Sequence, residues 1–408
     1  MEIIYLIRGM NNMDLKTEAL ALHKEHCGKL EIKSKVKIEN QKDLSLAYTP
    51  GVAYACKEIE ANPDDAYVYT SKSNMVAVIT DGSAVLGLGN IGPYGAIPVM
   101  EGKSILMKEL AGVDSIPICL ATQDVEEIIK TCKYLEPTLG AINLEDISAP
   151  RCVTIERRLI EEMNIPVFHD DQHGTSIIVA AAFLNVARLT KRNLKDMTLV
   201  MSGTGAAGSM IAKMLKRIGV GKIYAYDITG VIDKKKYDQY NFLIKELIDE
   251  GTYDTPENHD GTLASIMKGA DAFVGVSAPN IVTKDMIKSM NKGAIVFAMA
   301  NPTPEISYDD AKEAGAYICG SGRSDYPNQI NNVLAFPGLF KGALSVRASK
   351  INEEMKLAAA KAIANIISDN ELNPDYIVPG PFDKRVVEAV SKAVGDAAIK
   401  TGVSKLYK

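Results

Sequence analysis

The 408-residue chain has no tryptophan, only 6% aromatic residues and no excess of positive charge. Lys and Arg total 46 against 51 Asp and Glu, so the formal net charge is -5 and no global field attracts nucleic acid or anionic lipid. The most apolar stretch, residues 177–186, is much shorter than the roughly 18 residues that a membrane-spanning helix needs. We therefore expect neither a nucleic-acid partner nor a membrane partner, and any anionic ligand must be bound by a local site.

The six cysteines are scattered along the chain without a CxxC pair. This pattern is typical of reduced thiols in a cytoplasmic protein rather than of a disulfide framework. The apolar patch at residues 3–7 follows Glu2 and precedes no small-residue cleavage pattern, so we predict no signal peptide. We interpret residues 1–13 as a disordered extension or as the product of a start codon upstream of the true one.

Short apolar segments rich in Val and Ile alternate with segments of helical period along most of the chain. Because this alternation is typical of parallel strands joined by helices, we predict an α/β fold with two domains. An N-terminal domain is expected at residues 14–190, a Rossmann-type nucleotide-binding domain at 191–350, and helices that pack back on both domains at 351–408. The strands of the first domain are expected at residues 75–80, 115–121, 139–143 and 166–169. Those of the second are expected at 198–203, 222–227, 272–276, 294–300 and 316–319. A long helix is expected at 174–189 between the two series.

A glycine-rich turn at residues 202–208 follows the first strand of the second domain and precedes an apolar helix. In such a G-x-G-x-x-G turn, one glycine allows the tight turn, the next lets the backbone approach a pyrophosphate, and the last lets the helix pack closely on the strand. Asp227 ends the next strand, where its carboxylate can bind ribose hydroxyls. Asp227 favours NAD over NADP because it would repel a 2′-phosphate, although Lys234, Lys235 and Lys236 lie close enough in sequence to pair with that phosphate. The residues predicted to bind NAD or NADP are Gly203, Thr204, Gly205, Ala206, Ala207, Gly208 and Asp227.

Two acidic pairs each follow an apolar strand: Glu145 with Asp146, and Asp170 with Asp171. The carboxyl ends of parallel strands form the ligand-binding edge of an open α/β sheet. Carboxylates that meet there repel one another unless a divalent cation neutralises them, and an all-oxygen set suits Mg²⁺ or Mn²⁺. The neighbouring His169 and His173 leave zinc as an alternative, although no H-E-x-x-H motif is present. Acidic residues that merely cap the next helices are the other interpretation.

Residues 81–103 are dense in glycine, which predicts a loop whose backbone approaches a ligand, with Lys103 at the start of the following helix. A lysine held near a metal and partly desolvated has a lowered pKa and can act as a general base. Tyr48 precedes a Pro-Gly turn, where its hydroxyl can donate a proton. An ordinary exposed lysine and a core tyrosine are the alternative interpretations.

Together these motifs resemble the malic enzyme family in its short bacterial form, from about Leu15 to the end of the chain. The resemblance implies an N-terminal α/β malic-enzyme domain followed by a C-terminal Rossmann-type NAD(P)-binding domain. It also implies a homodimer, in which residues such as Lys72 reach the site of the neighbouring subunit. The segments that carry it are residues 48–50, 80–93, 102–103, 145–146, 170–175, 301–305, 331–332 and 336–338.

The same resemblance implies a role for each site residue. Tyr48 is the general acid and Lys103 the general base, while Glu145, Asp146 and Asp171 bind the metal, with Asp170 behind them. Lys103 with the amides of Asn301, Asn331 and Asn332 holds the nicotinamide ribose and the substrate carboxylate. One position departs from the long members of the family, because Ala84 stands where they carry an arginine that binds a substrate carboxylate. We expect Arg323 to replace that arginine.

The implied reaction is the oxidative decarboxylation of malate to pyruvate and CO₂ with reduction of NAD or NADP. A base takes the C2 hydroxyl proton as hydride leaves, a metal stabilises the enolate after CO₂ is lost, and an acid protonates C3. A dehydrogenase that only transfers hydride needs no metal, so the acidic pairs favour a decarboxylating enzyme. The alternatives are a malolactic enzyme or an oxaloacetate decarboxylase on the same scaffold, and a non-catalytic cofactor-binding protein.

Overall fold

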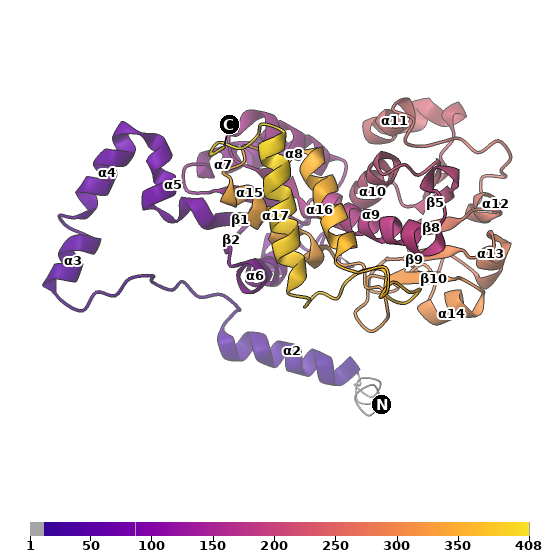
Figure 1. The fold of residues 1–408 in the computed structure, drawn as a ribbon, viewed down its shortest axis with the longest axis horizontal. Coiled ribbons are helices and arrows are strands. Elements are labelled where there is room, and N and C mark those ends of the chain that lie inside the picture. The colour runs from indigo at the N-terminus through magenta and orange to yellow at the C-terminus, as the bar shows by residue number, and fades with distance from the viewer. Residues whose placement is uncertain (1–11, 86, 408) are drawn as a thin grey trace.

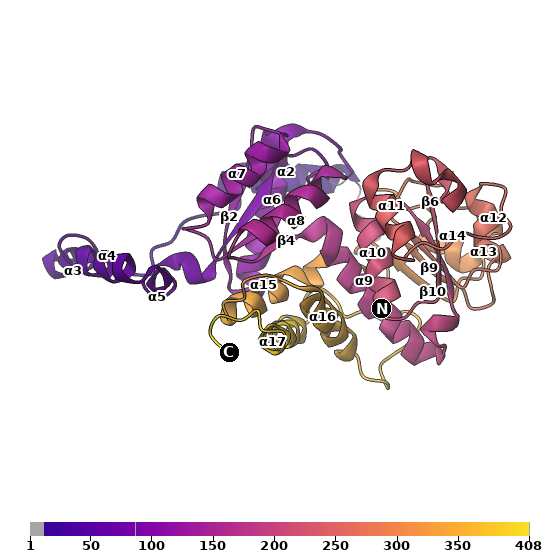
Figure 2. The ribbon, with the colours of Figure 1, turned by 90° about the horizontal axis from the view of Figure 1, so that it is seen from above.

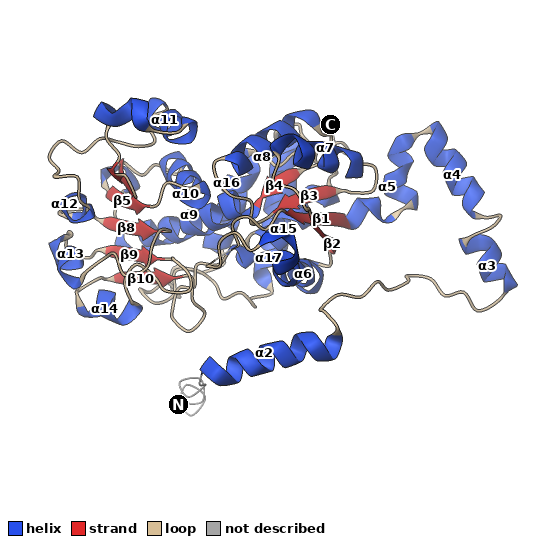
Figure 3. Ribbon diagram, turned by 180° about the vertical axis from the view of Figure 1, so that it is seen from behind, coloured by secondary structure: helices blue, strands red, loops and turns tan. Residues whose placement is uncertain are grey.

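Two separate sheets organise the chain in the computed structural model, which describes residues 12–85 and 87–407 (Figures 1 and 3). The first sheet has four parallel strands in the order β2-β1-β3-β4. The second has six strands in the order β10-β9-β8-β5-β6-β7, of which β7 runs antiparallel to β6. This arrangement confirms the predicted α/β fold with two sheets.

The first sheet consists of β1 (Met75–Thr80), β2 (Asp114–Cys119), β3 (Ala141–Leu144) and β4 (Val167–His169), and all four lie within two residues of the expected positions. The helices between them are α6 (Gly92–Ala111), α7 (Val125–Leu135) and α8 (Arg151–Glu162). The four middle residues of β1 are fully buried, since it is a central strand with helices packed on the sheet. Such burial explains why this strand is an unbroken apolar run without polar alternation.

The predicted loop at residues 81–103 is wrong beyond residue 91, because α6 begins at Gly92 and Lys103 lies in its second half. Gly92 adopts a φ of 74° and Pro93 occupies the first turn, where its missing N–H costs nothing. Glycine costs about 1 kcal/mol in a helix relative to alanine. The packing of Ala96, Met100 and Met107, which are fully buried, offsets that cost.

The second sheet consists of β5 (Thr198–Ser202), β6 (Lys222–Asp227), β7 (Gly230–Val231), β8 (Ala272–Gly275), β9 (Ile295–Ala298) and β10 (Ile318–Ser321). Its strands match the expected ones, except that β10 lies two residues later and the short β7 was not foreseen. The helices of this part are α10 (Ala206–Arg217), α11 (Phe242–Asp249), α12 (Leu263–Met267), α13 (Lys284–Ser289) and α14 (Tyr308–Glu313). Short 3-10 helices occur at η1 (Pro63–Asp65), η2 (Ser71–Asn74), η3 (Leu194–Asp196), η4 (Lys234–Gln239) and η5 (Asn332–Leu334).

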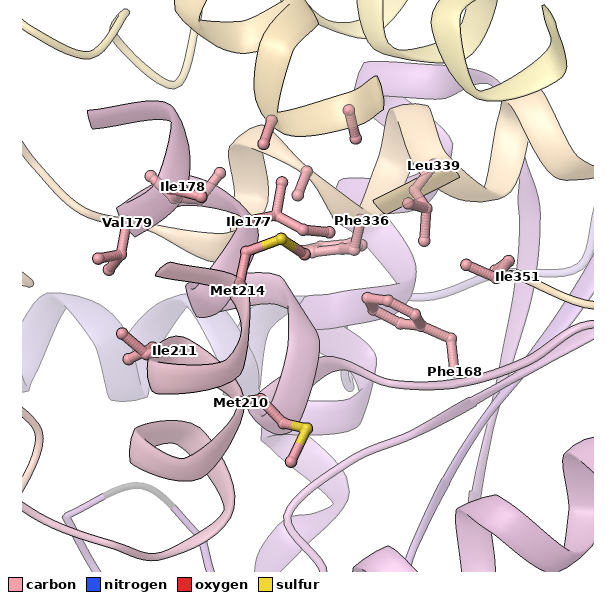
Figure 4. Close-up of a cluster of buried hydrophobic side chains, with 14 of the residues drawn as sticks. Phe168, Ile177, Ile178, Val179, Met210, Ile211, Met214, Phe336, Leu339 and Ile351 are labelled. Carbon is pink, nitrogen blue, oxygen red and sulfur yellow. The ribbon is translucent and has the colours of Figure 1, made fainter. Parts of the chain in front are cut away.

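Helix α9 (Asp170–Thr190) runs between the two sheets and begins four residues earlier than expected. It packs against α10 on one side and α16 (Glu353–Asn365) on the other, and α16 packs against α17 (Arg385–Lys400), which also contacts α15 (Phe336–Ser345) (Figure 2). Figure 4 shows the shared apolar cluster, in which Phe168, Ile177, Met214 and Phe336 come from four different elements. The domain limits at 190/191 and 350/351 stay predictions, since this core is continuous across them.

The N-terminal helices form an arm: α2 (Asn12–His26), α3 (Gln41–Ala47), α4 (Val52–Ala61) and α5 (Ala66–Tyr69). Figures 1 and 2 show α3 and α4 standing away from both sheets, and none of α3, α4 and α5 has a buried residue. Of the extension predicted at residues 1–13, residues 1–11 lie outside the described part of the chain. No helix within residues 12–85 and 87–407 is long and apolar enough to cross a membrane.

Candidate active site

Three carboxylates meet at the carboxyl edge of the first sheet. Strands β3 and β4 are parallel neighbours with Leu144 beside His169, so the residues that follow them come together. Glu145, Asp146 and Asp171 each offer a carboxylate oxygen, and these oxygens lie within 4.8 Å of one another. Asp146 has a φ of 54°, and its backbone N–H donates to Oδ2 of Asp171 over 2.8 Å. The structure thus joins the two acidic pairs that the sequence placed at strand ends.

Burial and mutual repulsion both disfavour the negative charges of these three carboxylates. Glu145 is almost fully buried, and its Oε2 accepts a 2.9 Å hydrogen bond from the amide of Asn143. Burial raises the pKa of Glu145 well above its usual range; Lys103 opposes that rise, while Asp171, Asp170 and Asp146 add to it. An all-oxygen set with unbalanced negative charge is the donor set that Mg²⁺ or Mn²⁺ requires. The residues present therefore fit such a cation.

Lys103 projects from α6 into this group. Its Nζ donates to Oδ2 of Asp170 and lies 3.1 Å from Oε1 of Glu145, and it stands 4.7 Å from the centre of the Phe336 ring. Burial alone would lower the pKa of Lys103, but Asp170, Glu145 and Asp171 outweigh it and raise the pKa above that of a free lysine. The lowering predicted for a lysine beside a bound metal stays a prediction, because this rise comes from carboxylates whose charge a bound metal would offset.

Asp170 lies behind the three-carboxylate group, where it connects Lys103 to η5. Its Oδ2 also accepts a hydrogen bond from the amide of Asn332, and burial raises the pKa of its carboxyl. Asn331 instead uses its side-chain oxygen to accept from the N–H of Val333. The structure therefore brings Asn332, but not the Asn331 amide oxygen, into contact with the lysine network.

Asn301 lies where the two sheets approach each other. It follows β9, and a Cβ on Gly87 of the glycine-rich loop would come within 3.2 Å of its carbonyl oxygen. A Cβ on Gly322 would come within 3.3 Å of its side-chain nitrogen. The backbone of Asn301 thus lies beside the glycine-rich loop of the first sheet, and its side-chain amide lies beside the residue that follows β10.

The glycines of the 202–208 turn behave as their spacing predicted. Gly203 has a φ of 102°, and a Cβ on Gly208 would lie 1.9 Å from the carbonyl oxygen of Gly203, so α10 can pack this closely only without a side chain there. A Cβ on Gly205 would meet no atom within 4 Å, so its backbone faces open space. Asp227 is oriented by 2.7 Å hydrogen bonds from the hydroxyl of Thr204 and the N–H of Thr229. Lys234 and Lys235 are exposed on η4.

Several predicted residues are not brought to the site. Tyr48 directly follows α3 and is 65% exposed, and Figure 1 shows α3 standing apart from α6, the helix that carries Lys103. Lys72 is buried, and within its own chain its Nζ donates to the carbonyls of Glu136 and Leu139 at 2.6 Å; that it reaches another subunit stays a prediction. Arg323 pairs with both carboxylate oxygens of Asp325, two residues away, and its role toward a substrate carboxylate stays a prediction.

His173 does not contribute to a zinc site with the acidic pairs, because its Nε2 lies 2.9 Å from Glu156 on the far side of α9. Sequence reasoning also missed Arg151, which begins α8 at the same sheet edge. Its guanidinium lies 2.6 Å from Oδ2 of Asp81 and donates to the hydroxyl of Ser83, next to Ala84. Arg151 could have been found from the sequence, because it begins a helix shortly after a strand that is followed by two acidic residues.

The fold and the site define a class, a two-domain nucleotide-binding α/β protein with a lysine and a carboxylate cluster at the edge of its other sheet. Residues 27–160 match the family described as malic enzyme, N-terminal domain, and residues 172–403 match malic enzyme, NAD binding domain. The chain belongs to the malic enzyme family and is an oxidoreductase of that family. The resemblance predicted from the motifs is thereby confirmed.

Individual relatives agree with this membership. The chain is 54% identical to the bifunctional malic/malolactic enzyme of Bacillus subtilis (strain 168), over 97% of this chain and 95% of that protein. It is 50% identical to the NAD-dependent malic enzyme of Geobacillus stearothermophilus, over 99% of this chain and 83% of that protein. The crystal structure of an NAD-dependent malic enzyme from Thermotoga maritima matches with a TM-score of 0.88 at 47% identity, covering 92% of this chain and 98% of that one.

Proposed function

We propose that this protein oxidatively decarboxylates (S)-malate to pyruvate and CO₂ while it reduces NAD or NADP. The observation that carries the proposal is the meeting of Lys103 with Glu145, Asp146 and Asp171 in a chain that also has an NAD-binding domain. Relatives of high identity are named as NAD-dependent and NADP-dependent malic enzymes, which supports the same reaction. Asp227 ends β6, and its carboxylate would repel a 2′-phosphate on the adenosine ribose, which favours NAD.

Glu145, Asp146 and Asp171 would hold Mg²⁺ or Mn²⁺. A divalent cation at this position supplies positive charge that stabilises the enolate left after CO₂ departs. Lys103 takes the C2 hydroxyl proton as hydride passes from C2 to the nicotinamide. Neighbouring carboxylates raise the pKa of Lys103, and a cation bound to them would offset their charge and so favour the neutral amine that a base needs.

Tyr48 would protonate C3 of the enolate, yet it lies on the arm and apart from Lys103 of its own chain. The arm carries large apolar side chains that are mostly exposed, including Leu46, Tyr54 and Val68. Such a patch is typical of a surface that a partner covers. We therefore propose a homodimer in which the arm of one chain brings Tyr48 to the Lys103 site of the other.

Absorbance of reduced nicotinamide, measured with malate, Mn²⁺ and either NAD or NADP, tests the reaction when pyruvate is assayed in parallel. We expect pyruvate in step with reduced cofactor, and loss of both in Lys103→Ala. Lys108→Ala is the matched control, since Lys108 lies on the same helix but is exposed and pairs with Asp114. Lactate without net cofactor reduction would favour the malolactic reaction, which the Bacillus subtilis relative supports by its name.

Mixing two inactive variants tests the shared site. Chains with Tyr48→Phe and chains with Lys103→Ala exchange into mixed dimers, each with one intact site if the tyrosine acts on the partner. About a quarter of wild-type activity should then return, because about half of the dimers are mixed. If Tyr48 serves its own chain, mixing restores nothing, and a monomer in light scattering contradicts the homodimer.

A further inference from the structure

A chain of buried polar groups lies behind the first turn of α9, on the side opposite the three-carboxylate group. It consists of Glu156 on α8, His173 on α9 and Lys356 on α16, with Glu353 at its outer end. Glu156, His173 and Lys356 are all more than nine-tenths buried. Burying charged groups costs folding free energy unless they are paired, so we expect this network to have a function.

Glu156 binds both ends of the segment that carries the site aspartates. Its Oε1 accepts a 2.9 Å hydrogen bond from the backbone N–H of His169, the residue before Asp170. Its Oε2 lies 2.9 Å from Nε2 of His173, two residues after Asp171. One carboxylate thus brackets Asp170 and Asp171 from behind. The residue at the N-cap of α9 supplies no side-chain cap, and the contacts of Glu156 hold the start of the helix together with those that Asp170 makes with Lys103 and Asn332.

The charges of the network are arranged to keep Glu156 an acceptor on both oxygens. Lys356 Nζ lies 3.1 Å from each ring nitrogen of His173 and 2.8 Å from Glu353. Because an ionised carboxylate can only accept, the 2.9 Å contact with Glu156 places the ring hydrogen of His173 on Nε2. Burial alone would raise the pKa of Glu156, but His173 and Lys356 hold it at about 2. An ionised Glu156 therefore accepts from His169 and His173 together.

Glu156 does not reach the reacting groups. It lines a cavity of about 470 Å³ between α8, α9, α10 and α16, together with His173 and Lys356. The three-carboxylate group is formed by side chains at the end of β3 and the start of α9, none of which lines this cavity. Any effect of Glu156 on the site must therefore pass through the backbone and side chain of α9.

We propose that Glu156 is a positioning residue, which fixes the first turn of α9 so that Asp171 meets Glu145 and Asp146 while Asp170 meets Lys103. This inference rests on the metal site of the proposed function. Removing a group that orients a metal ligand typically weakens metal binding by 10- to 100-fold.

The dissociation constant of Mn²⁺, read from the electron paramagnetic resonance signal of free Mn²⁺, tests the proposal without any turnover. We expect Glu156→Ala to weaken binding by about 10- to 100-fold. Glu156→Gln should lose less, because its oxygen still accepts from His169 N–H while its amide cannot accept from His173. Asp171→Asn reports the effect of a direct ligand. Glu305→Gln is the matched control and should bind Mn²⁺ as the wild type does, since Glu305 is a buried carboxylate that accepts the N–H groups of Ser277 and Ala300 in the other domain.

Two results separate this inference from the metal site itself. Unchanged Mn²⁺ affinity in both folded Glu156 variants, with weakened affinity in Asp171→Asn, overturns the inference and leaves the metal site standing. If the wild type binds no Mn²⁺, the metal site is wrong, and hydrogen exchange over residues 169–176 decides the role of Glu156. We expect the exchange rate there to rise in Glu156→Gln and not in Glu305→Gln. The same exchange rate in both variants would show that Glu156 does not hold the first turn of α9. The Gln variant keeps the test available if Glu156→Ala does not fold.

Discussion

Replacing two glycines of the 202–208 turn by alanine should affect different properties: Gly208→Ala should lower the stability, and Gly205→Ala should weaken cofactor binding. In Gly208→Ala the new Cβ would lie 1.9 Å from the carbonyl oxygen of Gly203, whereas real Cβ contacts are essentially never under 3.0 Å, so α10 must move by about 1 Å. Both colliding groups are held by β5 and α10, and overpacking of this kind costs about 1–3 kcal/mol. We expect about 3 kcal/mol and a fall of roughly 3–4 °C in the thermal midpoint, since the unfolding entropy of a 408-residue chain is about 0.9 kcal/mol/K.

Gly205→Ala should instead keep the stability and lose the cofactor. Its Cβ would have no neighbour within 4 Å, and its φ of -75° suits alanine, so we expect a change in stability under about 0.5 kcal/mol. If the turn binds the cofactor as we predict, the pyrophosphate approaches the backbone in this same open space. Loss of one or two charge-assisted hydrogen bonds there costs about 1.5–3 kcal/mol, which weakens cofactor binding roughly 10- to 100-fold.

Thermal unfolding gives the stabilities, and the fluorescence of bound NADH or NADPH gives the dissociation constants without any tryptophan emission, because the chain has no tryptophan. The reasoning is refuted if Gly205→Ala destabilises as much as Gly208→Ala. It is also refuted if Gly208→Ala unfolds at the wild-type temperature, since the collision at 1.9 Å would then be relieved at no cost.

Three further changes test other parts of the structure. Hydrogen bonds from Arg157 hold the pKa of Glu246 at about 2, with Lys213 adding to the effect, so its ion pair stabilises the fold above about pH 4.5 and is lost as the pH falls toward 2. Glu246→Gln should therefore cost about 1 kcal/mol near pH 7, after allowance for solvent screening, and almost nothing near pH 2 in urea unfolding; an equal cost at both pH values would contradict this. Asp227→Ser should shift kcat/KM toward NADP by at least about 10-fold, because the carboxylate that repels a 2′-phosphate is gone; an unchanged ratio would show that Asp227 does not select the cofactor. Asn332→Ala removes an amide donor from Asp170 and should lower kcat about 10-fold in malate turnover with little change in the Kd for NADH, whereas loss of NADH binding would assign Asn332 to the cofactor.

Most strands of both sheets, and the residue types at the sheet edges, could be predicted from the amino-acid sequence alone. Strands such as β1 and β5 are short apolar runs bounded by polar turns, so local pattern alone locates them within about two residues. The three turn glycines and the acidic pairs after β3 and β4 were likewise predictable, because each depends only on its place relative to a neighbouring strand.

Contacts between distant segments were decided only by the tertiary structure. Helix α6 begins at Gly92 because buried packing offsets the cost of its glycines, which no local pattern reveals. The pKa of Lys103 rises because carboxylates from β3 and α9 surround it, and Tyr48 lies apart from it because the arm makes little contact with the sheets. Glu156 reads in the sequence as one of many helix glutamates. Its importance comes from the packing of α8, α9 and α16, which places one buried carboxylate against both ends of the aspartate-bearing turn.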